Sequence, residues 1–66
     1  MMNQHERSAR AYRLIGWYAQ DIGDEGAEVS TMVSDILADL MHLCRHERLS
    51  FNARLSLARM HWEAER

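Results

Sequence analysis

Four side chains in the middle of the chain have the types and spacing of a metal site. They are Asp35, Asp39, His42 and His46. Their spacing of i, i+4, i+7 and i+11 places them on one narrow face of a helix, where two histidines one turn apart and a preceding carboxylate can bind zinc. The alternative is a solvated face with weak local pairs. The sequence favours the solvated face, because metal sites normally take ligands from several elements and the chain has no HExxH motif.

Two further side chains bear on chemistry at this place. His61, with Glu65 one turn later, can face the same stripe from the next helix and would then add a ligand. Cys44 is the only cysteine and lies in an apolar run, which predicts a small buried residue rather than a nucleophile paired with a histidine.

A basic and aromatic cluster near the start of the chain is a candidate interaction site. Arg10, Arg13 and Trp17 share one side of a predicted helix, and Arg13 can stack on Trp17 at i+4 spacing. The cluster suits a protein partner or, together with Arg7, a nucleic-acid phosphate. The alternative is that Trp17 covers one end of a small core. Since eight basic residues face ten acidic ones, for a net charge of −2, we expect a protein partner rather than nucleic acid.

Apolar residues at helical spacing predict three helices, over residues 6–20, 25–46 and 51–65, with residues 1–5 frayed. Gly23 and Gly26 should end the first helix and form the turn, and Ser50 should cap the third. The second helix should begin between 24 and 30, and its candidate caps are Asp24, Ser30 and Thr31. Gly16 inside the first helix either weakens it by about 1 kcal/mol or marks a close helix crossing.

These helices predict one all-α domain over residues 1–66, in which the second and third form an antiparallel hairpin. The predicted heart of the core combines the apolar faces of these two helices. It consists of Val29, Ile36, Leu40, Leu43, Phe51, Leu55 and Trp62.

The apolar surface exceeds what a three-helix chain can cover. The second helix is apolar over nearly half its circumference, and the third carries a second strip of Leu57, Met60 and Ala64. A chain of 66 residues also builds only a small core. We therefore expect a homodimeric bundle in which two hairpins form a four-helix core, with Leu57 and Met60 among the interacting residues.

The composition limits the cellular compartment and the class of protein that can be expected. The chain has no proline, one cysteine, no apolar stretch of about 18 residues and no charged-then-apolar leader pattern. We therefore expect a cytoplasmic protein that neither spans a membrane nor depends on disulfides. No sequence motif for a cofactor is present, and none is expected.

The chain resembles two groups of known proteins. The segments DILADLMH (35–42), LSF (49–51) and ARMHWEAE (58–65) resemble a pattern in short uncharacterised bacterial proteins often encoded on plasmids or phages, which supports the hairpin but implies no activity. More distantly, the second helix is similar to a metal-binding helix of the MazG-type all-α nucleotide pyrophosphohydrolases, with Asp39 matching its aspartate. That likeness implies magnesium-dependent hydrolysis. However, Ile36 stands at the glutamate position and the first helix lacks the facing glutamates, so magnesium would have too few oxygen ligands.

The sequence therefore predicts a small helical interaction or regulatory protein without enzymatic activity, which acts by binding another macromolecule. One alternative is a metal-binding or vestigial MazG-like domain that uses the Asp and His stripe. The other is a nucleic-acid binder that uses the arginines of the first helix.

Overall fold

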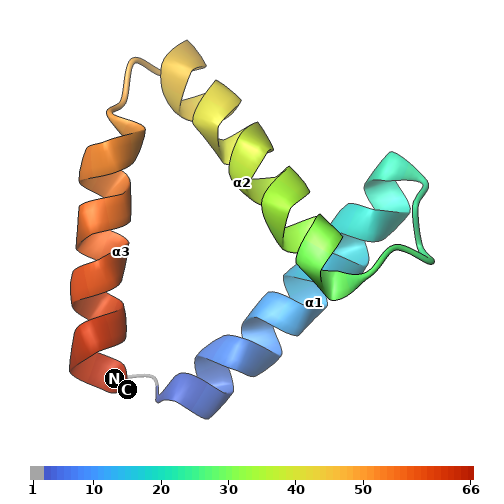
Figure 1. Ribbon diagram of the computed structural model, residues 1–66, viewed down its shortest axis with the longest axis horizontal. Coiled ribbons are helices and arrows are strands. Elements are labelled where there is room, and N and C mark those ends of the chain that lie inside the picture. The colour runs from blue at the N-terminus through green and yellow to red at the C-terminus, as the bar shows by residue number, and fades with distance from the viewer. Residues whose placement is uncertain (1–2) are drawn as a thin grey trace.

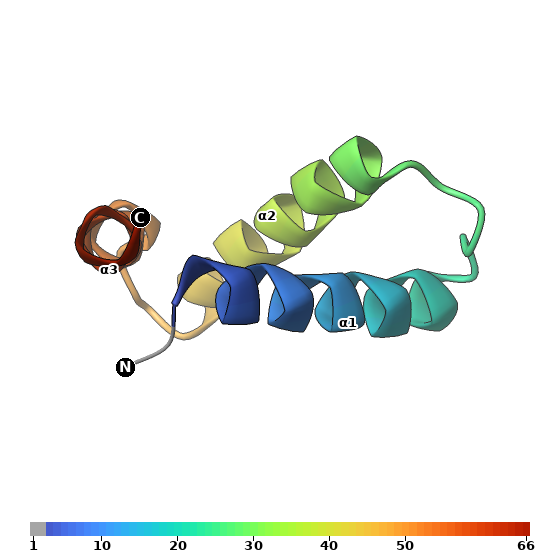
Figure 2. The same cartoon turned by 90° about the horizontal axis from the view of Figure 1, so that it is seen from below.

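The computed structural model describes residues 3–66, and this part of the chain contains three α-helices and no β-strand. They are α1 (Gln4–Ile22), α2 (Val29–His46) and α3 (Phe51–Glu65). Figure 1 shows them as the three sides of a triangle, and Figure 2 shows α3 nearly end-on beside the other two. The predicted all-α fold class is confirmed.

The ends of α1 are defined by two residues with different roles. The side chain of Asn3 accepts a hydrogen bond from the backbone N–H of Glu6 at 2.9 Å, so the helix begins at Gln4 rather than at residue 6. Residues 3–5 are therefore ordered by this cap, and the rest of the segment predicted to fray lies outside the described residues. At the other end Gly23 adopts φ +73°, a left-handed conformation that favours glycine, and closes α1 as predicted.

Helix α2 begins inside the predicted range of 24–30, but its predicted caps are wrong. Glu28 occupies the N-cap position, and its side chain makes no capping hydrogen bond to any other residue within 3–66. None of the three predicted caps holds this position, and the connection between α1 and α2 runs over residues 23–28.

The connection from α2 to α3 contains one strained residue and one cap. Arg48 has φ 59°, a conformation that costs a non-glycine residue about 1–2 kcal/mol. The N–H of Leu49 donates to the carbonyl of Cys44 at 2.7 Å, which pairs a carbonyl at the end of α2. The hydroxyl of Ser50 accepts from the N–H of Ala53 at 3.1 Å, so its predicted role as the cap of α3 is confirmed.

Helix α2 contacts both of its neighbours, and the apolar residues buried within 3–66 are Ala19, Met32 and Cys44. Met32 is the most completely covered, with 1% of its surface exposed. The predicted burial of Cys44 is confirmed. A Cβ added to Gly16 would meet no neighbouring atom within 4 Å, so this glycine does not serve a close helix crossing.

Helices α2 and α3 are joined at residues 47–50 and diverge from there, so that the far end of α3 reaches the start of α1 (Figure 1). Arg7 of α1 and Glu65 of α3 close this corner with an ion pair, in which Nε of Arg7 donates to Oε2 of Glu65 at 2.9 Å. The Glu65 side chain is 4% exposed. Close packing of α2 and α3 along their length as a hairpin stays a prediction.

The predicted list of core residues is wrong for most of its residues. Leu40 is 42% exposed, and Val29, Leu43, Leu55 and Trp62 are exposed as well. Only two of the predicted seven, Ile36 and Phe51, are half-buried. Helical periodicity showed which residues share a face, but burial also needs a neighbour against that face, and the diverging helices leave much of it uncovered.

Candidate functional site

The main feature of this molecule is the apolar surface that it leaves exposed. Fifteen large apolar side chains of residues 3–66 are exposed, and they come from all three helices and the α2–α3 connection. They are Tyr12, Leu14, Trp17, Ile22, Val29, Val33, Leu37, Leu40, Met41, Leu43, Leu49, Leu55, Leu57, Met60 and Trp62. Single exposed apolar residues are normal on a protein surface, but a large contiguous set marks an interaction surface.

The overall dimensions show the same property. The accessible surface is 5729 Å² for a chain of 7.7 kDa, whereas a compact monomer of that mass exposes about 4,300 Å². The radius of gyration is 13.1 Å, compared with about 11 Å for a compact domain of this length. The chain therefore exposes about 1,400 Å² more than a closed monomer would.

An apolar groove of about 660 Å³ lies between α1 and α2. Leucine, isoleucine, valine and aromatic side chains line it, and Asp21 is the charged residue in its lining. The full lining is Ala11, Leu14, Ile15, Trp17, Tyr18, Asp21, Val33, Ile36, Leu37 and Leu40. Trp17, with 66% of its surface exposed, therefore belongs to an open groove and does not seal a core.

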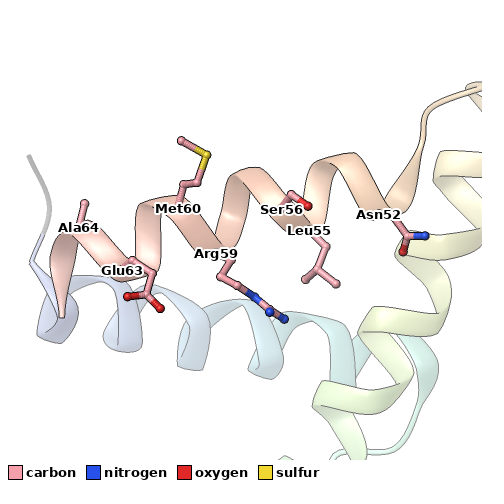
Figure 3. A pocket seen from close by; sticks show the side chains of 7 residues that line it. All are labelled: Asn52, Leu55, Ser56, Arg59, Met60, Glu63 and Ala64. Atoms are coloured by element: carbon pink, nitrogen blue, oxygen red, sulfur yellow. The ribbon is translucent and has the colours of Figure 1, made fainter.

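A second candidate surface is the open side of α3, from which all the residues labelled in Figure 3 come. Its apolar members are Leu55, Met60 and Ala64, and its charged members are Arg59 and Glu63. Figure 3 shows Leu55 and Arg59 projecting to one side of the helix and Met60 to the other. Met60 is 66% exposed, and Leu57 on the same helix is exposed as well.

The arginines of α1 do not form one continuous basic patch. Arg10 and Arg13 are exposed, whereas Arg7 is paired with Glu65. The cation–π contact found within residues 3–66 places Arg66 over the ring of Trp62 at 4.8 Å, and the predicted stacking of Arg13 on Trp17 is not formed there. The structure therefore leaves two arginines of α1, rather than three, available to a partner.

The side chains of the predicted metal site, which are those of Asp35, Asp39, His42 and His46, do not converge on a common point in the structure. Within residues 3–66, no three histidine, cysteine, aspartate or glutamate side chains lie together in a way that could hold a metal ion. His42 and His46 are exposed, and His46 lies 3.4 Å from the carboxylate of its neighbour Glu47. Asp35 is half-buried on the same helix. The position expected for His61 is wrong, because it lies at the α1–α3 corner with Arg7 and Glu65 rather than across from α2.

Asp39 makes a contact that its spacing in the sequence does not indicate. The hydroxyl of Tyr18 on α1 donates a hydrogen bond to Oδ2 of Asp39 on α2 at 2.5 Å. Asp39 therefore faces α1, not solvent alone, and it ties together the two walls of the groove. The periodicity of the first helix places Tyr18 in an apolar stripe, and only the crossing of the two helices shows its polar role.

This hydrogen bond raises the pKa of Tyr18 to about 12, because it stabilises the protonated phenol. The negative charges of Asp39, Asp35 and Asp21 act in the same direction, because they disfavour the phenolate. A raised acid pKa means that folding favours the protonated form. The stabilisation is therefore complete below the ordinary tyrosine pKa of about 10 and is lost as pH rises through about 12.

We expect ultraviolet titration to detect this pair directly. In a Tyr12→Phe background, where Tyr18 is the remaining tyrosine, tyrosinate absorbance should appear with a midpoint near pH 12. Adding Asp39→Asn should move that midpoint down towards about 10, since the charge that opposes ionisation is removed. Equal midpoints with and without the substitution would show that the contact does not exist in solution.

None of the helices within residues 3–66 is long and apolar enough to cross a membrane. No protein-family model matches the chain, and neither the curated proteins nor the solved structures include a match to it.

Proposed function

We propose that this protein is a small helical interaction protein that associates with a second copy of itself and, as a dimer, binds another protein. The observation that carries this proposal is the excess of about 1,400 Å² of accessible surface over a compact monomer of the same mass. A stable protein interface buries about 800 Å² on each partner, and obligate dimers bury more. The excess is therefore enough for an obligate interface.

Self-association is favoured by the small interior of the single chain. Three buried apolar residues within 3–66 are a small core for a domain of this length, which rarely gains more than about 3–5 kcal/mol from its core. A second copy supplies the missing apolar contact, and a two-fold arrangement closes on itself without forming fibres.

The second part of the proposal concerns the surface that a dimer leaves open. Arg10 and Arg13 are exposed on α1 and do not line the apolar groove. Arginine and tryptophan are enriched at the centres of protein interfaces, and Trp17 lies at the groove on the same helix. The net charge of −2 and the pairing of Arg7 with Glu65 favour a protein over a nucleic acid as the partner.

The dependence of thermal unfolding on protein concentration tests the self-association. Because a partner that binds only the native state stabilises it by mass action, the melting temperature followed by circular dichroism should rise with protein concentration. The measurement should be made with a reductant present, so that an intermolecular disulfide through Cys44 does not contribute. A melting temperature that stays constant over a hundredfold range of concentration would contradict the proposal.

A further inference from the structure

The groove between α1 and α2 needs a convex occupant. Two concave surfaces placed face to face would leave a gap between them, and interiors and interfaces are packed without such gaps. A helix with its side chains is about 10–12 Å across and fits between two other helices as a ridge. The surface on the second copy that fills this groove should therefore be a helix.

Helix α3 is the helix of the described chain that contributes nothing to the groove lining. Its two ends are held, by the connection to α2 and by the Arg7–Glu65 ion pair, while its length carries exposed apolar residues. Leu55 and Trp62, seven residues apart, lie on one side of it and are both exposed. It is therefore a preformed apolar ridge, and ordering it on binding costs little.

The charges on the two surfaces are complementary. The groove contains Asp21, and Asp39 is bound to the hydroxyl of Tyr18 in its wall. On α3, Glu63 is paired with Arg66 at 3.0 Å and Glu65 with Arg7, whereas Arg59 forms no ion pair with another residue of 3–66. A basic ridge thus meets an acidic groove, which favours this pairing over one that places like charges together.

From these observations we infer that α3 of a second copy occupies the α1–α2 groove, with Leu55 and Trp62 against its apolar lining and Arg59, on the same side of α3, towards Asp21. The contact is reciprocal, since each chain gives one ridge and one groove, as a two-fold interface requires. The excess surface of about 1,400 Å² on each chain is larger than the roughly 800 Å² that one partner buries in a stable interface, so the area available is sufficient for two such contacts. This inference rests on the self-association proposed above and assigns its interface.

A matched pair of leucines on α2 separates this interface from the four-helix contact of two hairpins. Leu37 lines the groove, and Leu43 is exposed on the same helix outside it. Leu37→Glu should raise the dimer dissociation constant at least about 30-fold, and Leu43→Glu should change it less than about threefold. On α3, Leu55→Glu should weaken the dimer like Leu37→Glu, and Met60→Glu, on the opposite side of the helix (Figure 3), should have as little effect as Leu43→Glu. The opposite order in either pair would overturn the assigned interface.

Charge reversal in two separate chains tests which residues face each other. Arg59→Asp alone and Asp21→Arg alone should each weaken self-association at least about tenfold, because both reciprocal contacts then place like charges together. An equimolar mixture of the two variants should associate within about threefold of the wild type, since both contacts are then between opposite charges. Sedimentation of the variants and of the mixture measures all three affinities.

The outcomes distinguish the two proposals. If the wild-type chain itself is monomeric, the proposed self-association fails. If the wild type is dimeric but the mixture of charge variants does not recover affinity, the dimer stands and the groove is not occupied by α3. Rescue that requires both substitutions in the same chain would place Arg59 and Asp21 in contact within one molecule and would also overturn the inference.

Discussion

Replacing Met32 with alanine should destabilise the protein by about 2–5 kcal/mol, because removal of a buried methionine loses apolar burial and leaves a cavity. Met32 has 1% of its surface exposed and is the most deeply buried large side chain within residues 3–66. Since a domain of this length rarely gains more than about 3–5 kcal/mol from its core, the variant should be close to unfolded at room temperature.

Chemical denaturation followed by helical circular dichroism measures this effect. Met41→Ala is the matched control, because Met41 lies on the same helix and is 53% exposed, and it should cost under about 1 kcal/mol. Equal losses for the two variants would mean that Met32 is not the centre of the core.

Removal of Arg7 should give the second largest effect, a loss of about 1–2 kcal/mol in the free energy of unfolding. Glu65 is nearly buried and would keep its charge without a partner, although the half-exposed arginine limits the cost. Arg10→Ala is the control, since Arg10 is exposed and makes no ion pair within residues 3–66, and it should change stability by less than about 0.5 kcal/mol.

Denaturation of the Arg7→Ala and Arg10→Ala variants in parallel measures how much the Arg7–Glu65 ion pair between α1 and α3 contributes to stability. The Arg7 effect should also shrink at high salt, because ion pairs at partly exposed sites are screened. If both variants are as stable as the wild type, the contact between α1 and α3 does not hold the triangle closed.

Local sequence signals predicted local structure well. Gly23 and Ser50 mark helix ends because their conformation or side chain serves the adjacent backbone, and no distant contact is needed. Cys44 could be placed inside from its apolar neighbours alone. Arg48 could not be recognised, since an arginine in the left-handed region gives no sequence signal for the turn that it makes.

Features that depend on how the helices lie relative to one another could not be predicted. Leu40 has the periodicity of a core residue, but it lines an open groove and 42% of its surface is exposed. The hydrogen bond from Tyr18 to Asp39 joins residues that the pattern assigns to an apolar face and to a solvated face. The Arg7–Glu65 pair spans almost the whole chain, and no spacing rule connects its members.

The sequence predicts that an apolar binding surface exists, but it does not predict where that surface lies. The excess of apolar residues on the second and third helices indicates an unfilled interface, and the exposure of Leu57 and Met60 agrees with that expectation. The groove between α1 and α2 could not be predicted, because its walls come from two helices whose crossing the sequence does not specify.

Sedimentation equilibrium of the wild-type chain at micromolar concentration is the most direct test of self-association. We expect a reversible monomer–dimer equilibrium dominated by a species of twice 7.7 kDa, because the surface exposed by one chain is sufficient for an obligate interface. A single species at 7.7 kDa that keeps its full helical circular dichroism signal would contradict the proposed dimer, since the apolar surface would then be stable in water without a second copy.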